Sequence, residues 1–503
     1  MNDLKNNQAN TDITSQAVSG TAWLTIANLV TLVLGLVLIM VSTRKFSPDV
    51  YGKYILLSVI AGLLIQLSTL GFGLTIPRFL AISEEAERKE LLVNTFLTLR
   101  LIAFLGMTII AVLIFPLLFI LFHLARETIV VVFIIMMFFL GGITSTMQST
   151  LQGFSRFKEI AIWDILSSSL NLILLFVLFD LAIDGLTILV CSYLIAYLIA
   201  DIYMYTAIPV RKHFVLEFSL IKEVIKFGFP LQLNDILSYI YNQINTFMIA
   251  AMLPAADIAY FSVVGKIPDS LLTFFDSYTT VFFPLFSHLH SSQEREKAEF
   301  LLSSALRVTT LIGLFMAGIV LLFGKDLIQL LFSDKYTSAA PLFFVLMVAL
   351  VLNMIGYLLG KSLVAVGESD KPAKINLAHA AVGLSLNWVL IPILGIFGVG
   401  IANVAGPAVT NPLNYFFLTR KFPIHILSSY LKPLAIFTVW AALIYFLHFD
   451  ALWFKVAALF FYLLINSLFS VITKDDYVFA RGESVKVLRE IAYRFVPRKS
   501  KQL

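Results

Sequence analysis

The sequence predicts an all-α polytopic membrane protein with about 14 transmembrane helices, and three observations support this fold class. Of the 503 residues, 59% are hydrophobic. Only 13% are charged, about half of the roughly 25% found in soluble domains. The charged residues also gather between long uncharged stretches, which a surface in contact with water would not contain. A water-soluble globular fold is therefore excluded.

The spans follow from the positions of the charges. A spanning helix needs about 20 mostly apolar residues, because the hydrocarbon core is about 30 Å thick and each residue rises about 1.5 Å. The predicted spans are residues 17–43, 54–77, 95–122, 128–152, 162–182, 185–207, 224–252, 267–288, 303–323, 341–364, 375–394, 397–418, 431–449 and 452–472. Residues 375–419 contain no Asp, Glu, Lys or Arg and are too long for one crossing. Pro392, Gly395 and Gly400 indicate a tight hairpin there.

The distribution of Lys and Arg predicts the orientation. An even number of spans places both termini on one side, and that side carries 27 Lys and Arg residues against 8 on the other. Both termini are therefore predicted to be cytoplasmic. The outward connections are all short, which leaves no room for the external domain that a membrane glycan polymerase or ligase would need.

The ends of the chain differ from its apolar body. Residues 1–16 are polar, and we expect them to form a cytoplasmic N-terminal segment. The uncharged run 17–43 is too long for a signal peptide, so we expect no cleavage there. In residues 474–503, several apolar residues lie among basic ones in a pattern typical of a helix at the cytoplasmic interface; they are Val478, Phe479, Val485, Leu488, Ile491, Ala492 and Phe495.

Several function classes are disfavoured by composition. The net charge of +5 is spread over short connections and the tail, so nucleic acid is not an expected partner. Cys191 is the only cysteine, which excludes an internal disulfide and a thiolate metal site. No metal site and no catalytic cluster is expected.

The chain repeats itself at an offset of about 206 to 216 residues. Matching positions include Pro77 with Pro284, Arg100 with Arg307, and Asn171 with Asn387. Six spans per repeat give both halves the same orientation, so we expect two six-helix lobes related by a pseudo-two-fold axis along the membrane normal. The predicted division is an N-lobe at 17–210, a C-lobe at 211–420, two further spans at 421–473 and the tail at 474–503. Two lobes around a central cleft are typical of a transporter.

Several motifs resemble those of one transporter family. They are FSPDVYGKY at 46–54, LSTLGFGLTIPRF at 67–79, DIAYFSVVGKI at 257–267, VFFPLF at 281–286 and KSLVAVGESDKPAK at 361–374. Residues from about 15 to 420 are similar to the polysaccharide flippases of the multidrug/oligosaccharidyl-lipid/polysaccharide exporter superfamily.

The resemblance implies a function and its partners. Such a protein moves a lipid-linked oligosaccharide, such as an O-antigen, capsule or exopolysaccharide repeat unit on polyprenyl pyrophosphate, from the cytoplasmic to the outer leaflet. The expected location is the cytoplasmic (inner or plasma) membrane, and the mechanism is alternating access. Besides membrane lipids, the expected partners are glycan polymerases or glycosyltransferases of the same pathway. We expect a monomer with no cofactor. The coupling ion, H⁺ or Na⁺, stays open.

An anionic lipid-linked substrate needs a hydrated cationic cleft, so cations in or beside the spans are candidates. The candidates are Lys266, Lys361, Arg78, Arg100 and Arg307. Lys266 occupies a position where the resembling family carries a cation facing the cleft, although it could instead extend to the outer interface. Arg78 could equally serve as a positive-inside anchor. Arg100 and Arg307 are repeat mates, for which a shared structural role is the alternative.

Polar residues in the spans form a second candidate group. Asp235, Tyr239, Asn242 and Thr246 recur at helical spacing in the seventh span, so they share one face. That face should line the cleft or a helix contact, because unpaired polar groups in lipid cost several kcal/mol. Asp276 could pair with a cleft lysine, bind a coupling ion, or complete a buried hydrogen-bond network.

The main alternative is a multidrug antiporter that expels organic cations. Antiporters of that branch are expected to use carboxylates, often in the first span. Residues 17–43 contain no acid, and Asn28 with hydroxyl side chains is the polar content there. A membrane-embedded glycosyltransferase would need a catalytic cluster beside a large loop, which the sequence lacks. The sequence therefore favours the flippase.

Overall fold

The structure is a computed structural model that describes residues 2–122, 128–181, 183–447, 451–469 and 471. Side chains are described from residue 19 onward within these ranges, except at residue 128. All regular elements in these ranges are helical, so the predicted all-α class is confirmed. The predicted interfacial helix at 474–503 lies outside the described residues.

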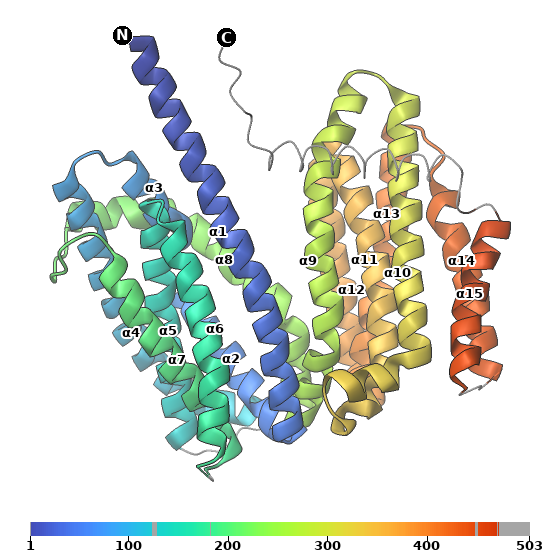
Figure 1. Ribbon diagram of the computed structural model, residues 1–503, viewed down its shortest axis with the longest axis horizontal. Helices are drawn as coiled ribbons and strands as arrows, with labels where there is room; N and C mark the ends of the chain where they lie inside the picture. Colours follow the sequence, from blue (N-terminus) through green and yellow to red (C-terminus); the bar gives the residue numbers. More distant parts are fainter. Residues whose placement is uncertain (1, 123–127, 182, 448–450, 470, 472–503) are drawn as a thin grey trace, which may run out of the picture. The chain divides into compact units, whose positions relative to one another are not determined.

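The helices follow one another along the chain with short connections (Figure 1). Their bounds are α1 Asn2–Lys45, α2 Pro48–Ser68, α3 Phe72–Ile82, α4 Ala86–Leu121, α5 Thr128–Gly153, α6 Phe157–Phe179, α7 Gly185–Ala207, α8 Phe218–Met252, α9 Ala255–Ser291, α10 Arg295–Leu331, the 3-10 helix η1 Asp334–Ala339, α11 Ala340–Ala365, α12 Asp370–Leu394, α13 Ile396–Lys421, α14 Leu427–Leu447 and α15 Leu452–Leu468.

Each predicted span coincides with one of these helices, except that the second span is divided between α2 and α3. Within the described ranges, 11 helices are long and apolar enough to cross a membrane. The helices α8 and α13 do not meet this criterion, and α15 has only 17 residues. The chain is thus a multi-pass membrane protein, while the count of fourteen spans is not confirmed.

Local sequence sets several helix ends. Ser47 caps α2 by accepting the Val50 N–H, and Pro48 occupies the first turn, where its missing donor costs nothing. Asp184 caps α7 in the same way. The hairpin predicted near Pro392 is confirmed, because Gly395, at a φ of 59°, is the single residue between α12 and α13. Only glycine adopts this left-handed region freely.

The described chain divides into two compact units. The first comprises residues 1–263 with 331–336, and the second comprises 264–330 with 337–503. This division is defined by contacts between residues in the structure. The predicted boundary between residues 210 and 211 was instead defined by the internal sequence repeat. The contacts place α8 with the first unit, because α8 packs against α2, α3 and α4. The predicted lobes themselves stay a prediction.

The first unit has an apolar core between α3, α4, α5, α6, α7 and α8. Phe72 and Phe96 meet edge to face in it, with 5.2 Å between their ring centroids. In the second unit, α13 packs against α11 and α12, and the Asn411 Nδ2 atom donates a hydrogen bond of 2.8 Å to the Leu352 carbonyl. Trp440 of α14 donates to the Ala458 carbonyl of α15 at 3.1 Å.

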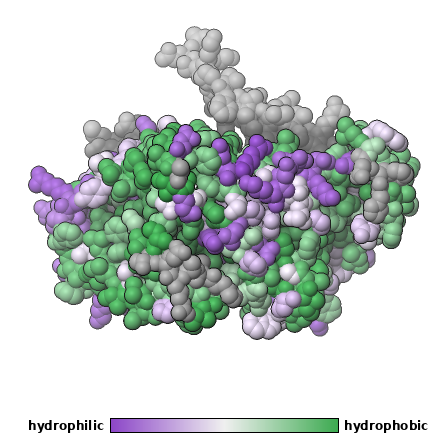
Figure 2. Space-filling model, turned by 90° about the horizontal axis from the view of Figure 1, so that it is seen from below, coloured by the Kyte–Doolittle hydropathy of each residue, from purple (hydrophilic) through white to green (hydrophobic). Residues whose placement is uncertain are grey.

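Large apolar side chains also cover the outside of the helices. Leu113 in α4 is 75% exposed and Phe446 in α14 is 78% exposed. Figure 2 shows apolar side chains over much of the visible described surface. Exposed apolar surface of this extent requires a nonpolar environment, which agrees with burial in lipid.

Gly52 of α2 marks a close backbone contact in the first unit. A Cβ atom at this position would lie 1.7 Å from the Ala255 carbonyl oxygen of α9. We therefore expect Gly52→Ala to lower the apparent melting temperature of the purified protein, with a cost of about 1–3 kcal/mol from overpacking. The matched control is Gly73→Ala, because no atom lies within 4 Å of a Cβ there. Equal melting temperatures for the two variants would contradict this packing.

Candidate functional site

A helix break inside the second predicted span begins the site. Helix α2 ends at Ser68 and α3 begins at Phe72. Between them, Leu70 and Gly71 have φ values of 53° and 70°. The last carbonyl groups of α2 have no partner within their own helix, and in a membrane they must find one inside the protein.

Arg100 and Gln232 supply those partners. The Arg100 Nη1 atom donates to the Ser68 carbonyl at 2.8 Å and to its hydroxyl at 3.0 Å. The Gln232 amide donates to the Gln66 carbonyl, and its Oε1 atom accepts the Gly71 N–H at 2.6 Å. Arg100 is only 2% exposed, and a cation at a helix C-terminus is also favoured by the helix dipole. The observed contacts of Arg100 are those of a helix cap, while its role in substrate binding stays a prediction.

The polar face of α8 lies partly at a helix contact, which is one of the two placements predicted for it. The Tyr239 hydroxyl donates to the Val59 carbonyl of α2 at 2.8 Å, and the buried Thr246 donates to the Gln243 side chain at 3.3 Å. Asp235 is half-buried and Asn242 is exposed. Neither side chain forms a hydrogen bond with a described residue.

Two other predicted residues of the first unit are exposed. The Arg78 guanidinium of α3 lies 4.0 Å from the centroid of the Phe227 ring. This cation–π contact leaves the hydrogen-bond donors of Arg78 available. Asn28 lies on an exposed part of α1, and its side chain has no hydrogen-bond partner in the part of the chain that the structure describes.

In the second unit, the predicted residues lie on α9, α10 and α11. Lys266 is exposed, and its charge acts on the Asp269 carboxylate one turn further along α9. Asp276 is exposed and accepts the Thr279 hydroxyl at 3.3 Å. Lys361 is half-buried and forms no hydrogen bond or ion pair with any described residue.

Arg307 differs from its repeat mate Arg100. It is half-buried, and its Nη2 atom donates to the Ser304 hydroxyl on its own helix at 3.2 Å. The Arg307 bond to Ser304 lies within α10, whereas Arg100 bonds to α2, and the shared structural role considered for the two arginines stays a prediction. The contacts above join the predicted residues to their neighbours rather than to one another.

A buried carboxylate in α7 was missed by the sequence reasoning. Asp201 is 5% exposed. Its carboxylate accepts the Thr144 hydroxyl of α5 at 2.9 Å and the Trp163 indole N–H of α6 at 2.9 Å. The available signal was that Asp201 is the only charged residue in the predicted span 185–207. An acid inside a span marks a functional site by default.

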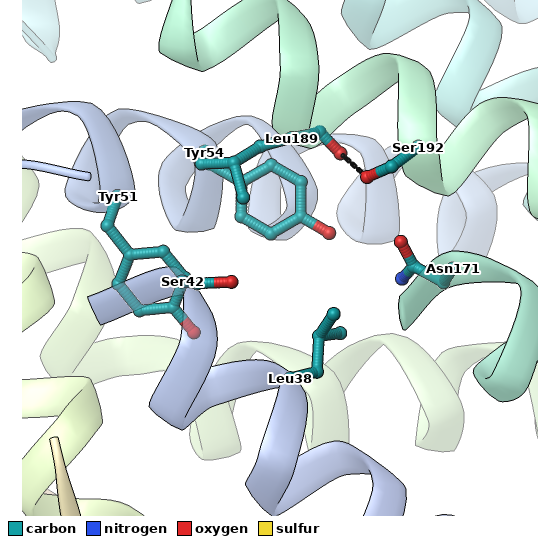
Figure 3. Close-up of a pocket in the computed structure, with 7 residues that line it drawn as sticks. All are labelled: Leu38, Ser42, Tyr51, Tyr54, Asn171, Leu189 and Ser192. Atoms are coloured by element: carbon teal, nitrogen blue, oxygen red, sulfur yellow. Dashed lines mark hydrogen bonds between the residues drawn. The ribbon is translucent and has the colours of Figure 1, made fainter. Parts of the chain in front are cut away.

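A small cavity lies in the same unit (Figure 3). It has a volume of about 20 Å³, enough for one water molecule. The lining residues are Leu38, Ser42, Tyr51, Tyr54, Asn171, Leu189 and Ser192. Figure 3 shows the Tyr54 hydroxyl and the Asn171 amide directed toward it, while Ser192 donates to the Leu189 carbonyl at 3.0 Å.

These features define the class of the protein: a multi-pass α-helical membrane protein with polar groups and a broken helix inside its spans. The chain belongs to the polysaccharide biosynthesis protein family, whose model matches residues 17–290. The MatE model matches residues 230–389. The resemblance inferred from the motifs is thus confirmed at the level of the family.

Curated relatives match part of the chain. It is 21% identical to a probable low-salt glycan biosynthesis flippase, Agl15, of Haloferax volcanii, over 37% of this chain and 39% of the relative. It is 22% identical to the capsular polysaccharide biosynthesis protein CapF of Staphylococcus aureus, over 50% of this chain and 65% of the relative. The matched stretches therefore span less than two thirds of these relatives.

Solved structures share the fold over a longer range. The lipid II flippase MurJ in an inward closed conformation matches with a TM-score of 0.69 and 15% identity, covering 90% of this chain and 99% of MurJ. An inward-facing multidrug resistance transporter of the MATE family matches with a TM-score of 0.61 and 16% identity, covering 80% of this chain and 98% of that one. At these identities the likeness is one of fold.

The cap on α2 can be tested directly. Arg100→Met keeps an unbranched side chain but removes the donors to Ser68, so we expect a loss of about 1–3 kcal/mol from the unsatisfied buried carbonyl group. The measurement is the thermal unfolding of the purified protein in lipid nanodiscs. The matched control is Arg88→Met, because Arg88 is exposed on the first turn of the same helix. If both variants unfold at the wild-type temperature, Arg100 does not cap α2.

Proposed function

We propose that the protein is a flippase that moves a polyprenyl-pyrophosphate-linked oligosaccharide from the cytoplasmic to the outer leaflet by alternating access. The observation that carries this proposal is the family match over residues 17–290. It is supported by the name of the Haloferax relative, a probable glycan biosynthesis flippase, and by the fold shared with a lipid II flippase over 90% of the chain. The proposed cargo is an O-antigen, capsule or exopolysaccharide repeat unit.

The proposed phosphate ligands are Lys266, Lys361 and Arg78. Each is exposed or half-buried, and each keeps N–H donors for an anion. Arg100 and Arg307 are weaker candidates, because each already donates to a serine. Asp235, Asn242 and Asn28 have side chains without a hydrogen-bond partner among the described residues and are proposed to contact the sugar or water in the translocation path. Tyr239 is proposed to border that path from its contact with α2.

The two compact units provide the two parts whose relative movement alternating access requires. We place the protein in the cytoplasmic membrane with both termini cytoplasmic, because the Lys and Arg residues are concentrated on that side. The proposed role is transport without covalent chemistry. Its proposed partners are the lipid-linked substrate, membrane lipids and the glycosyltransferases or polymerase that make and use the glycan.

An antiporter of organic cations is the second candidate. The match of the MatE model to residues 230–389 favours it. Residues 17–43 nevertheless carry no acid, and a carboxylate is the usual partner of an organic cation in a membrane site. Two results together would favour the antiporter. One is efflux of a cationic dye that depends on the protein, and the other is glycan export that is unchanged in cells lacking the protein.

The proposed ligands are tested by the single variants Lys266→Ala, Lys361→Ala and Arg78→Ala. A charge-assisted hydrogen bond contributes about 1.5–3 kcal/mol, so each loss should weaken substrate binding roughly tenfold or more. We expect glycan export to fall and lipid-linked glycan to accumulate at a normal protein level. The readouts are surface glycan, extracted lipid-linked glycan and an immunoblot.

The matched control is Lys297→Ala, because Lys297 is an exposed lysine paired with Glu294 near the start of α10. It should export glycan as the wild type does. Full export in all three test variants would eliminate the cationic path, while export in cells that lack the protein altogether would eliminate the flippase role.

A further inference from the structure

We propose that Asp201 is a proton-binding site inside the first unit. Its carboxylate lies within the last two turns of α7, where it is 5% exposed. It forms no ion pair with any residue that the structure describes. A buried carboxylate without a cation is costly in its charged form, and binding a proton removes that cost. The proposal concerns proton binding, which goes beyond lipid flipping and does not depend on the identity of the glycan.

The two hydrogen bonds to Asp201 hold it in place in either protonation state. Thr144 is 2.9 Å from both carboxylate oxygens, and the Trp163 Nε1 atom is 2.9 Å from Oδ1. A hydroxyl both donates and accepts, so Thr144 can donate to the carboxylate or accept from the carboxylic acid. The Asp201 carboxylate can therefore bind or release a proton without rearrangement of α5, α6 and α7.

The two donors to Asp201, Thr144 and Trp163, favour binding of a proton over binding of a metal cation. A hard cation is held by several oxygen ligands. An indole N–H only donates a hydrogen bond, so Trp163 occupies one oxygen of Asp201 without offering a ligand to a metal. No group of three or more His, Cys, Asp or Glu residues that could hold a metal was found among the described residues.

Other titratable groups surround the site. They are Tyr54 on α2, Asp164 on α6, and Tyr193 and Tyr197 on α7. The facing residues of α5, Thr144 and Gln148, do not titrate, and Gln148 lies 3.5 Å from the Asp164 carboxylate. Asp164 is half-buried, so Asp201 is the more enclosed of the two acids.

A row of aromatic residues joins Asp201 to the cavity. Trp163 meets Tyr197 edge to face, with 5.2 Å between ring centroids. Tyr197 lies 4.1 Å from Tyr193 by the same measure, and their hydroxyl groups interact. Tyr54 lines the cavity of Figure 3. A hydroxyl group both donates and accepts, so the hydroxyl groups of Tyr54, Tyr193 and Tyr197 are the proposed path between the cavity and Asp201, while Trp163, which only donates, holds the carboxylate.

The test uses the full chain in proteoliposomes adsorbed on a solid-supported electrode. A step from about pH 8 to about pH 5 should give a transient current as protons enter the buried site. Asp201→Asn keeps an acceptor for both donors but binds no proton, so its current should fall clearly below that of the wild type. Asp180→Asn, an exposed acid at the end of α6, should keep the wild-type current. A current of wild-type size in Asp201→Asn, or one produced by a sodium step at constant pH, overturns the proposal.

A second readout covers the case in which Asp201→Asn does not fold. The chain has 5 tryptophans, and replacing all except Trp163 with Phe leaves one reporter bonded to Asp201. Its emission should follow one titration step that is unaffected by sodium. Emission that is constant over the whole pH range would overturn the proposal.

The path is tested separately with Tyr197→Phe, which keeps the ring and removes the hydroxyl. We expect a slower rise of the current with unchanged total charge, because the site remains but its connection is interrupted. The matched control is Tyr205→Phe, since Tyr205 is an exposed tyrosine of the same helix. An unchanged rise time would exclude Tyr197 from the path.

Discussion

A lipid bilayer offers no hydrogen-bond partner to a peptide group, so each backbone polar group in a span must be satisfied within the protein. Continuous helices meet this requirement by themselves. The break between α2 and α3 does not, and its free carbonyl groups are bonded by Arg100 from α4 and Gln232 from α8. Gln232 lies 166 residues from its acceptor in the sequence. The cost of unsatisfied carbonyl groups thus fixes α8 against α2. It explains why the first compact unit includes α8 and continues to residue 263.

The same constraint separates the polar side chains of the spans into two groups. In the first group, Arg100, Gln232 and Tyr239 are bonded to backbone carbonyl groups of α2, and they hold helices together. In the second group, Lys361 and Asn242 form no hydrogen bond with described residues, so their donors remain for a solute. A polar residue in a span is therefore not a ligand by composition alone. Its role depends on whether the neighbouring helix presents an unsatisfied backbone group.

The proposed flippase role and the proposed proton site involve different residues. The candidate phosphate ligands Lys266 and Lys361 lie in the second unit, whereas Arg78, Asp201 and the tyrosine row lie in the first. Asp201 is bonded to Thr144 and Trp163, and neither of these is a proposed phosphate ligand. The two proposals therefore rest on separate side chains, and each can be tested without the other.

The sequence alone determined the helical class, the approximate limits of the helices and the hairpin at Gly395, because apolar length, charges and glycine act locally. It also determined the family, whose motifs lie in continuous segments. It did not determine the partner of Arg100, the placement of α8 or the enclosure of Asp201. Thr144 and Asp201 are 57 residues apart in the chain. The sequence pattern around either residue does not indicate that the other is its partner. Only the packing of α5, α6 and α7 decided that a lone acid in an apolar span would be bonded to a hydroxyl and an indole. The physical reason is that burial in lipid is a property of each segment, whereas a hydrogen bond between helices depends on which faces meet.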